Sequence, residues 1–591
     1  MLERISLTDP LEQSERVKGE ATHRSRRYRW GISLVISIQF ALLCWHAFRS
    51  SPVADEYGHL YAGIQYWRQG ETELFCVNPP LVRALGSVFA VSHWPGLDDF
   101  RPDYAAALHL VPGSRVEERP TARWEWPFGC QLFNAFPDIF RQRLFLGRML
   151  VSLFAVSATV MLYHWGARLF GAAAGLTAAA CWAFQPEVLS HGSLITNDIA
   201  VAAAMIISCY FFCQWMSSRR WKDALMGGVL LGICTLCKFT SLLLWPIFLG
   251  FAIWRFTQVR SPVFVVQAMT AVAMSLIIVG IPYGFDGVGK PLGEIQFISD
   301  GLAGDTATDI PPRYRDRWFA GIPSPVPEHF VIGMDRQQYD FQVGLRGFAA
   351  GQSGREGWWW FYLYAMLVKL PTGTLIAIFA SLLFGIWRLL DRTQSWNVRF
   401  EHSLIACVAV GMIEITAYKS GFAQQHRYIF PLYPFLFLLV VAPLALPSAG
   451  MTRWVQWTIK AGVVFTVMAS LAIAPHWMGA FNALSGGTDR GHFHLHNDAS
   501  DWGQDCYFLA DWIASHPDYR PLQWHPSDPM RYLQPEAFGM PADILQPKGA
   551  DRKWMIVSKS LLSLNQGLRD SLPTTPVEAI GATHFLYQVE P

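Results

Sequence analysis

The stretch WGISLVISIQFALLCWHAF, from Trp30 to Phe48, holds about 19 residues and no Asp, Glu, Lys or Arg. Because a helix rises about 1.5 Å per residue, this length predicts a transmembrane helix. The preceding residues are polar, include Arg24, Arg26 and Arg27, and lead to no small-residue cleavage site, which argues against a cleaved signal peptide. Since basic residues beside a first span stay in the cytoplasm, we expect residues 1–29 to form a cytoplasmic tail.

Further apolar runs begin near Leu144, Gly171, Ile199, Ala224, Thr240, Val263, Pro371, His402, Ile429 and Thr458. We therefore predict about eleven spans, and basic residues such as Arg219 and Arg255 fall on loops that this count places in the cytoplasm. The run from Ala224 to Trp254 is either one long helix or two short ones. We expect two, because a hairpin carries Lys238 to the outer surface, whereas a lysine at the bilayer centre costs about 3 kcal/mol.

The expected fold class is an all-α polytopic membrane domain over residues 30–474, followed by a small α/β domain outside the membrane over residues 475–591. Two more large outer segments are expected at residues 49–143 and 282–369. In the C-terminal domain, a helix is expected around Tyr507–Ser515. Strand-like runs occur at Pro521–Pro526, Lys553–Leu562 and Thr583–Val589.

The composition supports a membrane protein. Of the 591 residues, 52% are hydrophobic and 16% are charged, whereas soluble domains carry about 25% charged residues. The net charge of +2 provides no field for a polyanion, so no nucleic-acid partner is expected. We interpret Cys234 and Cys237 as membrane packing, since no second Cys or His pair lies nearby. Cys76 and Cys130 share the first outer segment, where a disulfide is permitted, but the sequence leaves their pairing open.

The stretch SPVADEYGHLYAGIQYWRQG directly follows the first span and has a helical pattern. Asp55 and His59 share one face at i, i+4, Glu56 lies beside them, and an apolar stripe lies opposite. We expect an amphipathic helix on the outer membrane surface. Adjacent carboxylates disfavour each other's ionisation, so one should be the better base. Alternatively, both acids are simply favoured by the dipole at a helix N-terminus.

Other polar residues are expected at the same level of the membrane. Asn78 is the expected cap of a helix in VNPPLVRALGSVF, and Asp198 in HGSLITND either caps the next helix or belongs to a site. Lys238 and Arg427 are also predicted at outer ends of spans, where cations alternatively reach lipid headgroups. The convergence of acids, Lys238 and Arg427 on one side of the membrane favours a functional site.

The segment HFHLH, from His492 to His496, would place three histidines on one face if it formed a strand. Metal ligands can have this spacing. Further ligands would have to come from Asp498 or Asp501, and nothing in the sequence fixes such a geometry. A structural segment is therefore the favoured interpretation.

These motifs, in this order, resemble polyprenyl-phosphate-sugar-dependent glycosyltransferases of the GT-C superfamily, in particular a bacterial branch of the protein O-mannosyltransferase and aminoarabinose transferase group. The resemblance covers about Asp55 to Asp505. It rests on the Asp-Glu pair with a following His, Pro-Pro-Leu, the lysine after the fifth span, Arg-Tyr-x-x-Pro, and the Trp-Gly-Gln-Asp segment. Asn78 stands where the relatives carry other residues, so their acceptor and metal assignments do not transfer.

The resemblance implies inverting transfer of a sugar from a polyprenyl-phosphate-linked donor to an acceptor hydroxyl on a protein, lipid or glycan. Asp55 would be the catalytic base, because a hydroxyl must lose its proton as it attacks, and the second catalytic residue, Glu56, would orient Asp55 together with His59. Cations would stabilise the leaving phosphate. The substrate-binding set implied is His59, Asn78, Asp198, Lys238, His426, Arg427 and Tyr428. No cofactor is required, although a divalent metal is possible.

The resemblance implies a location in the cytoplasmic (inner) membrane, in contact with membrane lipid. The basic N-terminal cluster and the count of eleven spans predict an N-terminus in the cytoplasm and a C-terminus outside. Two other classes compete with an enzyme. A transporter is disfavoured because no internal repeat is visible and the ionisable residues avoid the bilayer midplane. A non-catalytic protein of cell-envelope assembly is the other alternative. Release of free polyprenyl phosphate from a sugar-charged carrier would distinguish the enzyme from both.

Overall fold

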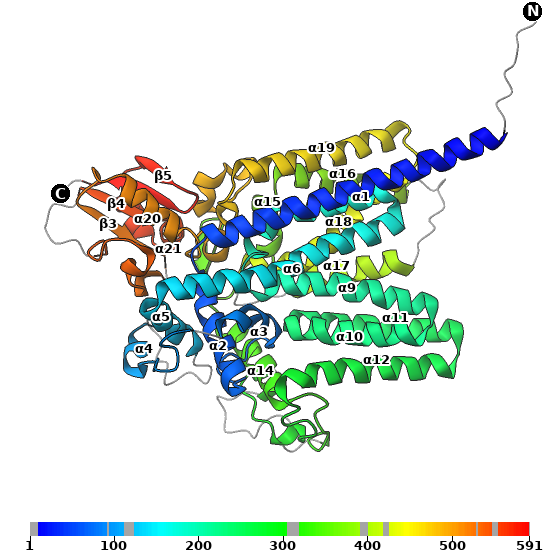
Figure 1. Cartoon of the computed structure of the whole chain (residues 1–591), viewed down its shortest axis with the longest axis horizontal. Coiled ribbons are helices and arrows are strands. Elements are labelled where there is room, and N and C mark those ends of the chain that lie inside the picture. Colours follow the sequence, from blue (N-terminus) through cyan, green and yellow to red (C-terminus); the bar gives the residue numbers. More distant parts are fainter. Residues whose placement is uncertain are drawn as a thin grey trace, which may run out of the picture.

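The computed structural model describes residues 10–91, 94–110, 123–303, 318–390, 400–417, 425–527, 530–545 and 553–589. Its main body is a bundle of long helices that lie side by side, with a small sheet domain at one end (Figure 1). The bundle helices are α1 (Pro10–Arg49), α6 (Pro137–Phe170), α7 (Ala172–Ala183), α9 (Asn197–Ser218), α10 (Trp221–Cys237), α11 (Leu244–Val259), α12 (Pro262–Gly280), α16 (Thr372–Leu390), α17 (Phe400–Ala417), α18 (Tyr433–Val441) and α19 (Gly450–Ala472).

The helical, multi-pass membrane domain predicted from the sequence is confirmed. Among the described residues, eight helices are long and apolar enough to cross a membrane, or nine if Phe361–Lys369 and Thr372–Arg388, bent by 119°, form one span. The expected eleven is therefore too high by this criterion. The difference has a simple cause: α7 has only 12 residues and α10 has 17, and 12 residues rise only about 18 Å.

The prediction of two helices meeting near Lys238 is confirmed. α10 ends at Cys237, and Lys238 has an extended backbone with φ −165° and ψ 146°. A 3-10 helix at Phe239–Leu243 then leads into α11. This break places Lys238 beside the start of α9, where its amine bonds to Asp198.

Non-spanning elements gather at one end of the bundle, and α1 begins at the other end (Figure 1). They are α2 (Ala54–Gln69), α3 (Leu81–Ser87), α4 (Tyr104–Leu110), α5 (Glu125–Ala135), α14 (Glu328–Val343), α15 (Phe361–Lys369) and the β1–β2 hairpin (Gly347–Ala349 and Gln352–Gly354). α1 continues without a break from Pro10, so the expected tail is helical from there, and residues 1–9 lie outside the described residues. Neither Cys76 nor Cys130 is in a disulfide.

Two elements of the first outer segment differ from expectation. α2 is not a surface helix: nearly all of Ala54–Ile64 is buried, because α5 and α3 cover the faces that the bilayer surface was expected to leave free. Asn78 does not cap a helix, since α3 begins only at Leu81 after Pro80. The pair of prolines moves the helix start beyond the reach of the Asn78 side chain.

The C-terminal domain is a four-stranded sheet with three short helices, in agreement with the predicted small α/β domain. The strand order is β3-β4-β6-β5; β3 and β4 are parallel, and the other neighbours are antiparallel. The expected strand at Lys553–Leu562 is shorter, because the chain turns into a helix at Lys559. The elements are β3 (Leu522–His525), β4 (Trp554–Ser558), β5 (Glu578–Ile580), β6 (His584–Gln588), α20 (Cys506–Ser515), α21 (Lys559–Leu564) and α22 (Gln566–Ser571).

Candidate active site

The start of α2 is bound to the segment that leads into the C-terminal domain. The Ser51 amide donates to the carbonyl of Gln504 at 2.9 Å, and the Ala54 amide donates to the carbonyl of Trp502 at 3.1 Å. The Ser51 hydroxyl donates to the Gly503 carbonyl at 2.6 Å and accepts from the Cys506 amide at 2.8 Å. This pairing fixes the first turn of α2, and therefore Asp55, relative to residues 502–506.

Asp55 and Arg427, 372 positions apart, form an ion pair in which Arg427 Nη2 donates to Asp55 Oδ2 at 2.8 Å. The Asp55 side chain keeps 35% of its surface exposed, whereas Arg427 keeps 6%. Burial by itself raises the pKa of Asp55, but the charge and hydrogen bond of Arg427, together with His59 and Arg123, outweigh this and hold that pKa below its usual value. Asp55 is therefore an ionised carboxylate at neutral pH.

Arg427 is surrounded by acids and one aromatic ring. Its Nε lies 3.4 Å from Asp198 Oδ2, and its guanidinium lies 4.1 Å from the ring centre of Trp502. Asp498 accepts the backbone amides of His426 and Arg427, each at 3.1 Å. Burial raises the pKa of Asp498 to about 6, although Arg427 and these two amides lower it. The Nη1 atom of Arg427 is buried and donates to no group among the described residues.

Lys238 extends this network toward the membrane helices. Its amine donates to Asp198 Oδ1 at 2.5 Å and lies 3.6 Å from the ring centre of Tyr428. Asp198 thus bridges the two cations, since it also faces Arg427. As predicted, the structure brings Asp55, Lys238 and Arg427 together, in one continuous chain of charges.

Glu56 faces away from this network. Its side chain is fully buried and forms a bidentate ion pair with Arg148 of α6. It also accepts the amides of Ile195 at 2.9 Å and Val53 at 3.1 Å. These four contacts saturate the carboxylate, so Glu56 anchors α2 to α6 and to the segment before α9.

The two predicted histidines also lie behind the site. His59 Nδ1 bonds to the Ile195 carbonyl at 2.6 Å, and burial lowers the pKa of His59 although Asp55 raises it. His59 is therefore neutral at pH 7, and its Nδ1 carries the proton. His426 is fully buried, and its ring packs edge-on against Phe430 at 5.0 Å.

Two neighbouring cavities lie at the site. The first, here called the inner cavity, has a volume of about 230 Å³ and is lined by Asp55 and Arg427. The second, the helix-end cavity, has about 690 Å³ and includes Lys238 and apolar residues of the α11 and α17 ends. Both are lined by Asn78, Gln337 and Tyr428, so they share a wall. The predicted residues Glu56, His59, Asp198 and His426 line neither cavity.

Several lining residues were not predicted. Arg123 and Asp340 line the inner cavity and form an ion pair with a separation of 3.4 Å. Arg123 also pairs with Glu125 at 2.5 Å. No sequence signal distinguished Arg123 from the other arginines of the outer loops. The buried Asn78 Oδ1, by contrast, accepts no hydrogen bond from any described residue and lines both cavities.

The histidine segment is not a strand. Thr488–Phe493 forms a 3-10 helix, and His494 bonds instead to Tyr364 and to the carbonyl of Ser485. Asp498 binds backbone amides of residues 426 and 427. Within the described part of the chain, no group of three His, Cys, Asp or Glu side chains has the geometry of a metal site.

Residues 126–282 match the model of the dolichyl-phosphate-mannose-protein mannosyltransferase family. The predicted resemblance to this family is confirmed over these residues. The matched stretch runs from α5 through α12 and includes Asp198 and Lys238. Of these two residues, Lys238 lines the helix-end cavity, and Asp198 binds its amine. No curated protein matches the chain in sequence.

The chain is also similar to three solved structures. ArnT from Cupriavidus metallidurans in the apo state has a TM-score of 0.43 and 11% identity, over 94% of this chain and 97% of that one. The same protein bound to undecaprenyl phosphate has a TM-score of 0.43 and 12% identity over the same shares. The oligosaccharyltransferase of Archaeoglobus fulgidus has 0.37 and 12%, over 89% of this chain and 68% of that one.

Proposed function

We propose that this protein transfers a sugar, with inversion, from a polyprenyl-phosphate-linked donor to an acceptor hydroxyl at the outer face of the cytoplasmic membrane. One observation carries the proposal. An ionised carboxylate, Asp55, and a buried arginine with an unused Nη1 donor, Arg427, line the inner cavity, which shares a wall with the amphiphilic helix-end cavity. Buried donors are nearly always satisfied, so an unused one on a residue that lines a cavity suggests an anionic ligand.

The helix-end cavity suits the donor. Lys238 and Tyr428 stand at its polar side, and Leu242, Leu243 and Ile415 provide apolar surface. A further cavity of about 500 Å³ is lined along the same two helices, α11 and α17, by residues 246–254 and 400–407. A lipid phosphate would therefore place its charged group at Lys238 and Arg427 and its apolar tail toward α11 and α17. Asn78 Oδ1 would accept a hydroxyl of the sugar.

In the proposed reaction, Asp55 takes the proton of the acceptor hydroxyl as that oxygen attacks the anomeric carbon. The bond between the anomeric carbon and the phosphate oxygen breaks, and its electron pair leaves with the polyprenyl phosphate. The growing negative charge falls on the oxygens held by Arg427 and Lys238. Attack from the face opposite the phosphate inverts the sugar centre. These steps, as written, do not require a metal ion.

Donor binding would also activate the base. In the free protein, Arg427 is shared among Asp55, Asp198 and Asp498. A phosphate that binds Arg427 would compete with Asp55 for the N–H donors of Arg427. Because Arg427 makes the largest contribution that lowers the pKa of Asp55, this competition raises the basicity of Asp55. The base would thus strengthen only when the donor is in place.

The test is release of free polyprenyl phosphate from donor lipids charged with mannose, glucose or aminoarabinose, with cell-envelope extract as the source of acceptor. We expect release from one of these donors by the purified protein and a fall of roughly 10²- to 10⁴-fold for Asp55→Asn. Absence of release with every donor, or release unchanged in Asp55→Asn, would contradict the proposal. A transporter or an assembly protein would give no release.

A further inference from the structure

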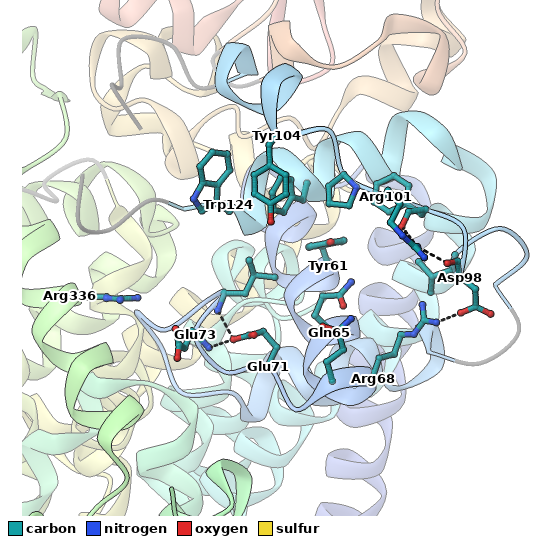
Figure 2. A pocket seen from close by; sticks show the side chains of 16 residues that line it. Tyr61, Gln65, Arg68, Glu71, Glu73, Asp98, Arg101, Tyr104, Trp124 and Arg336 are labelled. Carbon is teal, nitrogen blue, oxygen red and sulfur yellow. Dashed lines mark hydrogen bonds and ion pairs between the residues drawn. The ribbon is translucent and has the colours of Figure 1, made fainter. Parts of the chain in front are cut away.

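The largest of the described cavities lies outside the proposed donor site. It has a volume of about 880 Å³ and is enclosed by α2, the segments 71–74 and 97–104, the start of α5, and Arg336 of α14. We call it the loop cavity. Figure 2 shows the side chains of Tyr61, Gln65, Tyr104 and Trp124 around its open centre. This volume falls within the range of about 300–1,000 Å³ that is typical of ligand pockets.

An aromatic cluster forms one side of the loop cavity. Phe128 stands at its centre, with the ring of Trp124 stacked at 5.5 Å and 22°. Tyr104 and Tyr61 meet the Phe128 ring edge-on at 4.8 and 5.8 Å. Tyr104 is 60% exposed, so its ring is available to a ligand. Rings held this way offer flat apolar faces at low cost in conformational entropy.

Polar groups that are already held in place form the other side. Arg68 pairs with Asp98, and Arg101 donates to the carbonyls of Asp98 at 2.6 Å and Phe100 at 2.9 Å. Glu71 accepts the backbone amides of residues 73 and 74 at 2.7 and 3.3 Å. These planar amide, carboxylate and guanidinium groups present donors and acceptors in fixed directions.

The charges of the lining cancel. Three arginines, Arg68, Arg101 and Arg336, stand against three carboxylates, those of Glu71, Glu73 and Asp98. The cavity therefore has no excess of either sign to select a polyanion or a cationic peptide. Flat aromatic faces combined with many planar hydrogen-bonding groups suit a ligand that has both apolar C–H faces and hydroxyls. An uncharged carbohydrate has this chemistry.

The loop cavity lies next to the inner cavity, behind one thin wall of chain. Within residues 71–78, side chains of both cavities follow one another: Glu71, Glu73 and Leu74 line the loop cavity, and Phe75, Val77 and Asn78 line the inner one. Two neighbouring pairs repeat this division, since Trp124 and Arg336 face the loop cavity and Arg123 and Gln337 face the inner cavity.

From this placement, we propose that the loop cavity binds an uncharged oligosaccharide and that this oligosaccharide is part of the acceptor. The first half stands by itself, while naming the glycan as acceptor rests on the proposed sugar transfer. A chain held against Tyr104 and Trp124 would extend its end over residues 71–78 toward Asp55. The cavity would then select the acceptor, and the helix-end cavity would select the donor.

The test is calorimetric titration of the full-length protein in lipid nanodiscs with mannohexaose, maltohexaose and chitohexaose. We expect at least one to bind, and we expect Tyr104→Ala and Gln65→Ala to weaken that binding by about tenfold or more each. Trp318→Ala provides the matched control, because Trp318 is 89% exposed and lies outside the cavity lining. Its affinity should equal that of the unmodified protein.

Three outcomes would overturn the inference: no binding of any hexasaccharide, equal binding by Tyr104→Ala, or binding only of an unglycosylated peptide run in parallel. Asp55→Asn separates this inference from the proposed function, since it should bind the hexasaccharide normally while losing turnover. Binding without any release of polyprenyl phosphate would refute the proposed function and leave the carbohydrate site standing. Release of polyprenyl phosphate without binding of a hexasaccharide would refute the carbohydrate site and leave the proposed function standing.

Discussion

Arg427 faces three carboxylates, with its nearest nitrogen atoms 2.8 Å from Asp55, 3.4 Å from Asp198 and 3.9 Å from Asp498. Such a surplus of acid keeps the guanidinium charged and fixes its plane, but it leaves Nη1 unused. A planar group can grip a phosphate through two parallel hydrogen bonds, whereas a lysine provides a point charge. The geometry of Arg427 therefore matters in addition to its charge.

We predict that Arg427→Ala weakens donor binding and turnover together, and that Arg427→Lys restores only part of each, because the two-pronged contact is lost. Donor binding and single-turnover rates would be measured with the charged lipid found in the release assay. Arg49→Ala is the control, since its ion pair with Asp511 is exposed and worth little. Full recovery by Arg427→Lys would show that charge alone suffices and would remove the bidentate contact from the mechanism.

A second prediction concerns the pH dependence of Asp55. The kcat/KM profile reports the free protein and kcat reports the donor complex. Arg427 holds the pKa of Asp55 low in the free protein, so Asp55 stays a base down to lower pH there. Once a phosphate occupies Arg427, that pKa rises, and activity is lost at higher pH as acid is added. The acid limb of kcat should therefore lie above that of kcat/KM.

The measurement rests on the difference between the two acid limbs. Acid limbs at the same pH would mean that donor binding does not release Asp55 from Arg427.

The sequence identified the residues of the ion-pair network but not which of them line the cavities and which anchor the helices. Asp55, Asn78, Lys238, Arg427 and Tyr428 line the cavities, whereas Glu56 turns toward Arg148. Adjacent residues on a helix point about 100° apart, so Asp55 and Glu56 diverge, whereas the sequence interpretation assigned both to the catalytic site. It could not predict which of them would meet a buried arginine, because Arg148 lies 92 positions away.

At the scale of elements, α2 is fixed from two sides, by Arg148 and the Ile195 amide at Glu56 and by the Trp502 carbonyl at Ala54. The sequence pattern predicted a membrane-surface helix because it contains an apolar stripe and a polar face. Both faces are covered in the fold: α5 and α3 pack on α2, and its acids find buried cations. Such tertiary partners leave no trace in local periodicity.

We predict that Glu56→Gln and Asp55→Asn, adjacent and chemically equivalent changes, have opposite effects. Glu56→Gln leaves Arg148 buried without its charge partner, which costs roughly 3–5 kcal/mol of stability. Asp55→Asn alters a side chain that is 35% exposed, and the fold should tolerate it. Thermal unfolding in detergent would show a large fall in Tm for Glu56→Gln alone. Turnover would fall in Asp55→Asn at unchanged Tm.

The reverse pattern, a stable Glu56→Gln protein without turnover, would give Glu56 a chemical role and contradict its assignment as an anchor.

The boundaries of the strands also show how little local sequence determines. β3 and β6 formed within their predicted runs, but β5 has only three residues, too few for a periodic signal. Its strand conformation comes from pairing with β6.

At the scale of the whole molecule, the sheet domain and the bundle meet at the site itself. Asp498 holds the backbone of residues 426 and 427, and the ring of Trp502 lies under Arg427. The C-terminal domain is therefore joined to the ion-pair network through the segment that precedes α20. This coupling spans more than 400 positions between Asp55 and Trp502, and the resemblance indicated the segment without indicating its contacts.

The last prediction concerns the orientation of the bundle. α9 begins beside the site, where Asp198 is in its first turn, and ends at Ser218. The sheet domain lies at the same end of the bundle as the site (Figure 1). The basic loops then place the site outside. In intact cells, a membrane-impermeant thiol reagent should label Ser515→Cys, whose position in α20 is exposed, and should label Ser217→Cys only after permeabilisation. The unmodified chain controls for its own cysteines, most of which are buried. Labelling of Ser217→Cys alone would invert the topology and place Asp55 in the cytoplasm, where a donor presented at the outer face could not reach it.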